Sequence, residues 1–111
     1  MKFRIALTLD DRNPKLLEMI TRINSLYDFH PVVNLGKISH DEVFEIYGRS
    51  KALLFPSLKE SLGLPLIEAN QLGLKVLVSN LPFANDILVN PITFDPKSSD
   101  SIATVIMNFL Q

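Results

Sequence analysis

Two short apolar runs, residues 52–55 (Ala-Leu-Leu-Phe) and 76–79 (Val-Leu-Val-Ser), show no alternation of polar and apolar side chains. Runs of this length and composition are typical of strands that are buried on both faces, as in a parallel sheet. Between them, residues 66–72 predict a helix that Pro65 opens and Gly73 closes. A buried strand, a helix and a second buried strand in succession indicate an α/β fold.

The same alternation precedes the first of these runs. Residues 3–9 predict a strand and residues 32–35 predict another. Between them, Asn13-Pro14 predicts the start of a helix, whose apolar residues recur at helical spacing: Leu16, Ile20, Ile23 and Tyr27. Ser39 and Glu42 fit a capping box at the start of a further helix, which carries Val43, Ile46 and Tyr47 on one face.

After residue 79 the pattern is weaker but continues in the same order. Residues 83–89 predict a short helix, residues 92–94 an edge strand, and residues 101–110 a last helix capped by Ser99 or Asp100. We therefore expect residues 1–111 to form a single α/β domain, a Rossmann-like open parallel sheet with helices on both faces.

Composition narrows the classes of function. The chain carries 11 basic and 12 acidic residues, so no electrostatic argument favours nucleic acid or an anionic membrane as partner. It has no cysteine and two histidines, and we expect no metal centre. The apolar part of residues 1–10 is too short for a signal peptide, and no apolar run approaches the roughly 18–20 residues of a membrane span. We expect a cytoplasmic protein, and membrane association is not indicated.

Residues 55–69 concentrate the features of a ligand site. They hold a strand end, a Gly-Leu-Pro turn, a helix start and two glutamates, Glu60 and Glu68. In open parallel sheets, ligands bind outside the carboxyl ends of the strands, and this segment follows such an end. A carboxylate accepts two hydrogen bonds from a vicinal diol, so the two glutamates could hold two parts of one extended ligand.

The turn between the glutamates supplies a second kind of binding group. Gly63 is the residue of this turn most expected to adopt a backbone conformation that residues with a Cβ disfavour. Pro65 fixes the φ angle at the first position of the helix. We expect the amides of Leu64, Leu66 and Ile67 to lack intrahelical partners. Free amides at the positive end of a helix dipole attract an anion or a sugar hydroxyl.

Other readings of the acidic residues are open at this point. Glu68 could complement the helix dipole and Glu60 could be a solvated loop residue, because glutamates at this spacing are common. Asp10 and Asp11 resemble the acidic pair of response-regulator receiver domains. That reading requires an aspartate at the end of the third strand, where residues 55–57 are Phe-Pro-Ser, so we interpret the pair as a solvated turn.

Several motifs stand in the order and spacing of one known family. They are residues 35–39 (LGKIS), 46–52 (IYGRSKA), 54–57 (LFPS), 60–69 (ESLGLPLIEA), 72–76 (LGLKV), 79–80 (SN), 94–96 (FDP) and 101–103 (SIA). With them, the stretch from about residue 33 to residue 103 resembles the C-terminal domain of the GT-B glycosyltransferases, specifically the retaining group 1 enzymes of family 4. This likeness decides between the readings of the glutamate pair in favour of a ligand site.

The resemblance implies a nucleotide-sugar donor site and a hexosyltransferase type of activity. Glu60 would be the catalytic residue beside the transferred sugar, and Glu68 would bind the ribose of the nucleotide. Lys37 and Ile38 would border the base, mainly through their backbone. The sugar hydroxyls and phosphate would be bound by backbone amides of the residues that follow Glu60: Ser61, Leu62, Gly63 and Leu64. The resemblance implies no metal and no cofactor, with the nucleotide sugar as donor substrate.

The chain departs from the family pattern in two ways. Ser61 and Leu62 replace the frequent Gly and Phe, a change that backbone binding tolerates. The Gly-Arg and Lys-Gly pair that grips the diphosphate in the family has no match, and residues 3–9 align with the family's second strand. We therefore expect a partial GT-B C-terminal domain whose first strand and N-terminal acceptor domain are missing.

Loss of the first strand has a physical consequence. In the strand order 3-2-1-4-5-6, strand 1 is central, so its absence leaves two open edges. We expect the sheet to close up, or a homodimer or another chain to pair with those edges. The sequence thus predicts the donor-binding part of a retaining glycosyltransferase, inactive in isolation. The alternative is a non-catalytic remnant that serves association through its sheet edge. The sugar, base and acceptor stay open.

Overall fold

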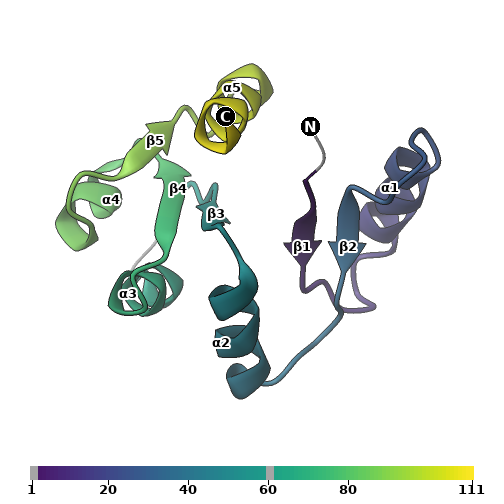
Figure 1. Cartoon of the computed structure of the whole chain (residues 1–111), viewed down its shortest axis with the longest axis horizontal. Coiled ribbons are helices and arrows are strands. Elements are labelled where there is room, and N and C mark those ends of the chain that lie inside the picture. Colours follow the sequence, from purple (N-terminus) through teal and green to yellow (C-terminus); the bar gives the residue numbers. More distant parts are fainter. Residues whose placement is uncertain (1–2, 60–61) are drawn as a thin grey trace. The chain divides into compact units, whose positions relative to one another are not determined.

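Strands and helices alternate along the chain in a computed structural model that describes residues 3–59 and 62–111 (Figure 1). The elements in chain order are β1 (Ile5–Leu7), α1 (Pro14–Asn24), β2 (Val32–Asn34), α2 (His40–Arg49), β3 (Ala52–Phe55), α3 (Leu64–Gln71), β4 (Lys75–Ser79), α4 (Pro82–Ile87), β5 (Ile92–Phe94) and α5 (Ser99–Leu110). Every strand pairing is parallel, which confirms the predicted α/β class.

The strands form two separate sheets, with the orders β1-β2 and β3-β4-β5. The chain also divides into two compact units, a first unit of Met1–Val43 and a second unit of Phe44–Gln111. Among the described residues β1 pairs with β2 and β3 pairs with β4, so the first of the two expected alternatives, closure of the sheet by pairing of β1 with β3, is not observed.

In the first unit, the end of α1 is fixed to the outer edge of β2. The side chain of Asn24 donates from Nδ2 to the carbonyl of Val32 at 2.8 Å and accepts from its amide at 3.1 Å. On the other side, β2 pairs with β1, with Ile5 opposite Val32 and Leu7 opposite Asn34. An amide side chain therefore takes the place of a further strand, and it satisfies both polar groups of Val32 that face away from β1.

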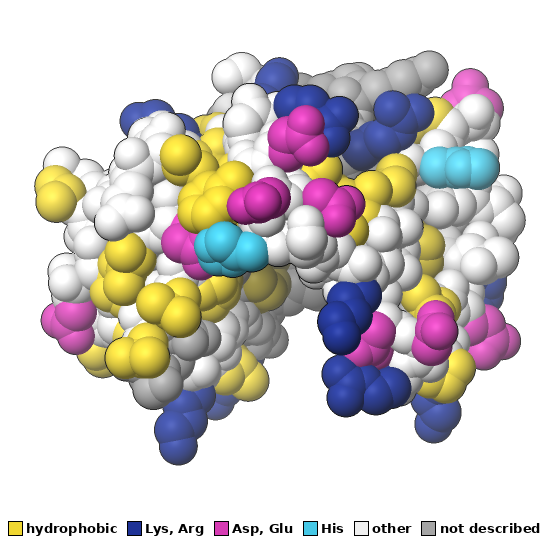
Figure 2. Space-filling view, turned by 90° about the horizontal axis from the view of Figure 1, so that it is seen from below, with side chains coloured by type: hydrophobic (Ala, Val, Ile, Leu, Met, Phe, Trp, Pro, Cys, Tyr) yellow, Lys and Arg dark blue, Asp and Glu magenta, His cyan; other side chains and the backbone are white. Residues whose placement is uncertain are grey.

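The apolar stripe of α1 is solvent-exposed. Leu16, Met19 and Ile23 recur at helical spacing, yet each is more than a third exposed, and no residue of α1 is buried. Hydrophobic side chains lie among charged ones of both signs on the face of the molecule in Figure 2. The hydrophobic content of 47% is therefore only partly used to build a core.

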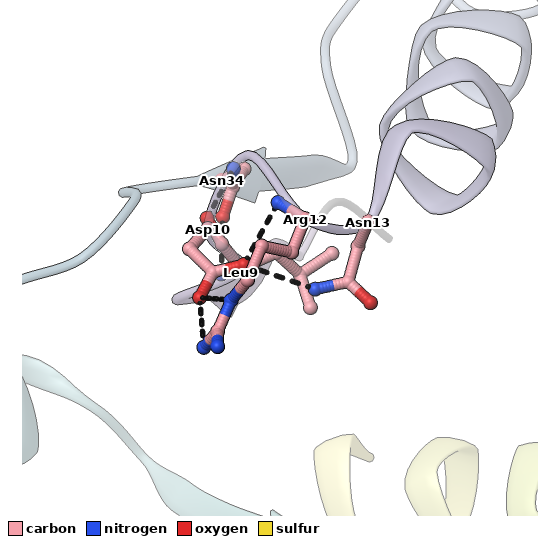
Figure 3. A network of polar contacts seen from close by, with 5 residues as sticks. All are labelled: Leu9, Asp10, Arg12, Asn13 and Asn34. Atoms are coloured by element: carbon pink, nitrogen blue, oxygen red, sulfur yellow. Dashed lines mark hydrogen bonds and ion pairs between the residues drawn. The ribbon is translucent and has the colours of Figure 1, made fainter.

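The carboxyl ends of β1 and β2 are joined by the side chain of Asn34. Its Oδ1 accepts from the amide of Leu9 at 2.8 Å and from the amide of Gly36 at 3.3 Å, while its Nδ2 donates to the carbonyl of Leu9 at 3.1 Å. Figure 3 shows this contact beside the turn at Asp10. One side chain thereby fixes the loops that follow both strands of this sheet.

Asp10 organises the turn that leads into α1 (Figure 3). Its carboxylate accepts from the backbone amide and from the guanidinium of Arg12, at 2.6 Å from Nη2, and from the side chain of Asn13 at 3.3 Å. The guanidinium of Arg12 chiefly lowers the pKa of Asp10 from its ordinary 3.8. These contacts support the interpretation of this acidic pair as a turn.

The core of the second unit lies between the sheet and two of its helices. Val76 and Val78 of β4 face Leu66 and Ala69 of α3 and Ala84 of α4, and all of these side chains are buried. Leu77 points to the opposite face because side chains alternate along a strand, and it too is buried. Strand β4 is therefore buried on both faces, as its unbroken apolar run predicted.

The helix starts follow the predicted capping chemistry in α2, and two others need a correction. Asn13 is the cap position of α1, but its side chain makes no capping hydrogen bond and donates to Asp10 instead. Ser39 and Glu42 form the capping box, in which each side chain accepts from the other residue's amide at 3.2 Å. The cap of α5 is Ser98, so the prediction of Ser99 or Asp100 was wrong. Ser98 has extended backbone, and its Oγ accepts from the amide of Ser101 at 3.1 Å. Ser99 and Asp100 already lie within the helix, where the backbone conformation does not allow this capping contact.

Candidate functional site

The candidate site begins at the turn before α3, where Gly63 has left-handed backbone. Its φ of 61° and ψ of 40° are values that residues with a Cβ resist, and it is buried. Its carbonyl accepts from the amides of Leu66 at 3.0 Å and Ile67 at 3.1 Å. Gly63 is thus the cap residue of α3, in the special conformation that the sequence predicted.

These hydrogen bonds correct the expectation that Leu66 and Ile67 offer free amides. Ile67 makes the first full helical bond, and Leu66 closes a tighter turn onto the same carbonyl. Pro65 has no amide hydrogen. The amide of Leu64, at the positive end of the helix dipole, meets no acceptor among residues 3–59 and 62–111. The anion-attracting part of the described turn is therefore smaller than predicted.

Glu68 lies in the second turn of a helix that is firmly anchored. Leu66 and Ala69, on either side of it, are fully buried against β4, so α3 cannot turn about its axis without exposing both. Glu68 itself is half-buried, and its Oε2 atom is shielded from solvent. The helix therefore presents this carboxylate in a fixed direction, as a ligand for a diol requires.

Tyr47 of α2 lies close enough to Glu68 to be affected by its charge. Burial, and then the negative charge of Glu68, raise the pKa of Tyr47 from its ordinary 10.0. Its ring meets the ring of Phe44 edge-on, with centroids 6.2 Å apart. The sequence placed Tyr47 only on the apolar face of its helix. No local signal connects it to Glu68, because the two residues belong to different helices.

The elevated pKa of Tyr47 predicts a spectroscopic result. In a Tyr27→Phe variant, which leaves Tyr47 as the only tyrosine, phenolate absorbance should rise with a midpoint above pH 10. The stabilising contribution of the neutral phenol is complete below pH 10 and is lost as the pH rises through the elevated pKa. Adding Glu68→Gln should lower the midpoint. A midpoint at or below 10 would contradict the burial of Tyr47, and a midpoint that Glu68→Gln leaves unchanged would contradict its proximity to Glu68.

Other predicted site residues around this turn are placed only in part. Glu60 and Ser61 lie outside the described residues. Leu62 and Leu64 are 66% and 56% exposed, so their apolar side chains make few contacts within the chain. Ahead of them, Ser57 donates from Oγ to the carbonyl of Lys59 at 2.9 Å and orders the segment that leaves β3.

Lys37 and Ile38 follow β2 and belong to the first unit, whereas Gly63, Leu64 and Glu68 belong to the second. Lys37 is exposed and Ile38 is half-buried. Gly36 before them has a φ of 73°, which turns the backbone at the end of the strand. The structure thus brings together Gly63, Leu64 and Glu68 on one helix start, and places Lys37 and Ile38 at the carboxyl end of another sheet.

The described residues contain no cluster of three or more His, Cys, Asp or Glu side chains that could hold a metal ion. Across the same part of the chain, every helix is too short or too polar to span a membrane.

Comparisons with known proteins agree with this architecture. Residues 18–111 match the family model "Glycosyl transferases group 1". The serotype-specific mannosyltransferase WbdA of Escherichia coli is 43% identical over 63 residues, which are 52% of this chain and 8% of that protein. The O-antigen chain mannosyltransferase RfbU of Salmonella typhimurium is 32% identical over 81 residues, 72% of this chain and 23% of that protein. The chain therefore spans less than a quarter of the length of these relatives.

A solved structure supports the fold independently of close sequence similarity. Sucrose-phosphate synthase from Thermosynechococcus elongatus matches 95% of this chain with a TM-score of 0.75 and 21% identity, over 28% of its own chain. The likeness confirms the Rossmann-like α/β fold that the sequence predicted.

Proposed function

Because the chain belongs to the group 1 glycosyl transferases, we propose that it is the nucleotide-sugar donor-binding part of a retaining glycosyltransferase. The observation that carries this proposal is the start of α3. There a left-handed Gly63, the amide of Leu64 and the half-buried carboxylate of Glu68 lie on one anchored helix. Such a helix start suits a phosphorylated ligand that also carries a diol.

Each part of the donor has a proposed partner. The carboxylate of Glu68 accepts hydrogen bonds from the ribose hydroxyls, and the positive end of the α3 dipole faces phosphate. Glu60 is the catalytic residue beside the transferred sugar, and Lys37 and Ile38 border the base. Backbone amides at Ser61, Leu62, Gly63 and Leu64 bind the sugar and phosphate. The mannosyltransferase relatives favour mannose as the transferred hexose.

Turnover is proposed to require more than this chain. Glycosyl transfer needs the donor and acceptor held together with water excluded, and an acceptor-binding domain or another chain supplies the second wall of such a site. The proposal includes neither a metal nor a cofactor, since the nucleotide sugar is a substrate. The proposed location is the cytoplasm.

A second candidate function rests on the open sheet edges. Among the described residues, β1 pairs only with β2, and β3 pairs only with β4, so each strand keeps one edge without a partner strand. Open edges pair readily with other strands. On this reading the chain is a non-catalytic remnant whose edges form a homodimer or bind another chain.

Titration calorimetry with UDP, GDP and their sugars tests the donor-site proposal. We expect saturable binding that Glu68→Gln weakens about 10–100-fold, because a charged acceptor for two hydroxyls is lost. Glu45→Gln, a change at an exposed glutamate of α2, is the matched control and should leave the affinity unchanged. The wild type should prefer ribonucleotides to 2′-deoxy and 3′-deoxy analogues, and Glu68→Gln should lose that preference. No binding of any nucleotide, together with a stable dimer in solution, would favour the second candidate.

A further inference from the structure

Helix α1 carries an apolar stripe on a side that does not face its sheet. Leu17 and Ile20 are half-buried on the inner side, where the helix packs against β2. The stripe consists of four side chains that are 44%, 47%, 37% and 76% exposed: Leu16, Met19, Ile23 and Leu26. An amphipathic helix that packs only against its own unit needs one apolar face. The second apolar face of α1 is therefore available to a partner.

The stripe continues past the last residue of α1. The amide of Ser25 donates to the carbonyl of Thr21 and the amide of Leu26 donates to the carbonyl of Ile23, each at 3.1 Å. These hydrogen bonds extend the helical path, so Leu26 stays on the same side of the helix as Ile23. The four apolar side chains thus form one continuous row about 15 Å long.

The order of residues in the stripe is symmetric about Thr21. Leu16 and Leu26 lie equally far from it in opposite directions, and so do Met19 and Ile23. Two copies of α1 that pack antiparallel about a two-fold axis at this level place Leu16 opposite Leu26 and Met19 opposite Ile23. A two-fold interface uses the same patch on both subunits, and this row is complementary to itself in that way.

Charged residues beside the stripe are complementary in the same arrangement. Glu18 and Arg22 lie one helical turn apart on one side of the stripe, and both are exposed. In the antiparallel pair, Glu18 of one copy lies about 3 Å along the helix axis from Arg22 of the other. The two Arg22 side chains approach each other near the two-fold axis, and each has a Glu18 of the other copy beside it. Within the described part of the chain, neither residue forms an ion pair.

We propose that the stripe binds a second copy of this chain, as an antiparallel pair of α1 helices related by a two-fold axis at Thr21. The contact uses the first unit alone and involves neither the open sheet edges nor the start of α3. It is therefore independent of the proposed function. Four side chains on each copy bury less than the roughly 1,200 Å² of a standard interface, so the dimer should be weak and should form only as the protein concentration rises.

Sedimentation equilibrium over a range of protein concentrations tests for this dimer. We expect reversible dimerisation that Met19→Glu weakens about tenfold or more, because a charge then faces Ile23 of the other copy. Met19 is 47% exposed, so the variant should keep its fold. Val89→Glu, at an 86% exposed side chain of the second unit, is the matched control and should dimerise as the wild type does. A dimer that Met19→Glu leaves unchanged, or a chain that is monomeric throughout, would overturn the proposal.

Exchange of charges tests whether two α1 helices meet. Glu18→Arg and Arg22→Glu should each weaken self-association, since each change brings like charges together across the two-fold axis. Mixed in equal amounts, the two variants should form a heterodimer tighter than either homodimer, because the contacts between the chains then join opposite charges. A charge effect confined to each helix predicts no such preference. A mixture that associates no better than its components would contradict the pairing.

Engineered cysteines test the antiparallel register, since the chain has no cysteine of its own. Leu16→Cys mixed with Leu26→Cys should form disulfides between chains about tenfold faster than Leu16→Cys alone. In the proposed dimer the two residues at position 16 are about 15 Å apart along the helix axis, whereas positions 16 and 26 lie opposite each other. Equal rates in the two samples would rule out the proposed register and, with it, the proposal.

Discussion

Replacing Leu66 with alanine should lower the free energy of unfolding of the second unit by about 2–5 kcal/mol. Leu66 has no solvent-exposed surface and packs in the core with Val76, Val78 and Ala84. Truncation removes buried methyl groups and leaves a cavity that the short helix α3 cannot fill, because Ala69 on the same face is also fully buried. The loss is a large fraction of the stability of a typical domain.

Leu64→Ala is the matched control for this prediction. Leu64 lies two positions earlier on the same helix but is 56% exposed, so its truncation should cost less than about 1 kcal/mol. Amide hydrogen exchange of the full chain measures both variants, because the protection of α3 and β4 reports on the second unit alone. If both variants lost exchange protection equally, Leu66 would not be the residue that packs α3 against the sheet.

Replacing Asn34 with alanine should destabilise the first unit by about 1–3 kcal/mol. The change removes three hydrogen bonds: Oδ1 accepts from the amides of Leu9 and Gly36, and Nδ2 donates to the carbonyl of Leu9. The two bonds to Leu9 join the loops after β1 and β2. It leaves the amide and carbonyl of Leu9 without these partners in a part-buried place. Exchange protection of β1 and β2 should fall, while that of β4 should stay as in the wild type.

Two further variants sharpen the Asn34 prediction. Asn34→Asp keeps the acceptor but replaces the donor to the carbonyl of Leu9 with a negative oxygen, so it should cost nearly as much as alanine. Asn13→Ala removes a single bond of 3.3 Å to Asp10 and should cost less than about 1 kcal/mol. If Asn34→Ala cost no more than Asn13→Ala, Asn34 would not be the residue that fixes this end of the sheet.

The anchoring of α3 gives these stability predictions a functional meaning. Leu66 and Ala69 fix the helix, and Glu68 projects from it between them. Under the proposed function, loss of the Leu66 side chain would loosen the direction of the Glu68 carboxylate before it unfolded the unit. Nucleotide affinity in Leu66→Ala should therefore fall even at temperatures where the variant is folded.

Local chemistry explains which parts of the site could be predicted. Gly63 was assigned to a special backbone conformation because it precedes a Leu-Pro helix start, and its φ of 61° has the same local origin. The capping box at Ser39 and Glu42 is equally local. The amides of Leu66 and Ile67 were assigned wrongly, since the pattern could not show that the Gly63 carbonyl accepts from both.

The order of strands and helices, the parallel α/β class and the family motifs were determined by the sequence alone, because they depend on residues within one or two turns of each other. The tertiary structure decided what depends on contacts between distant residues. It separated the strands into two sheets and placed Tyr47 near Glu68. It also buried Leu66 fully while leaving Leu64 exposed, although both are leucines on one helix. Such contacts form only when helices and strands pack together. The spacing of apolar residues in one element shows which of its faces is buried, but not which other element will contact that face.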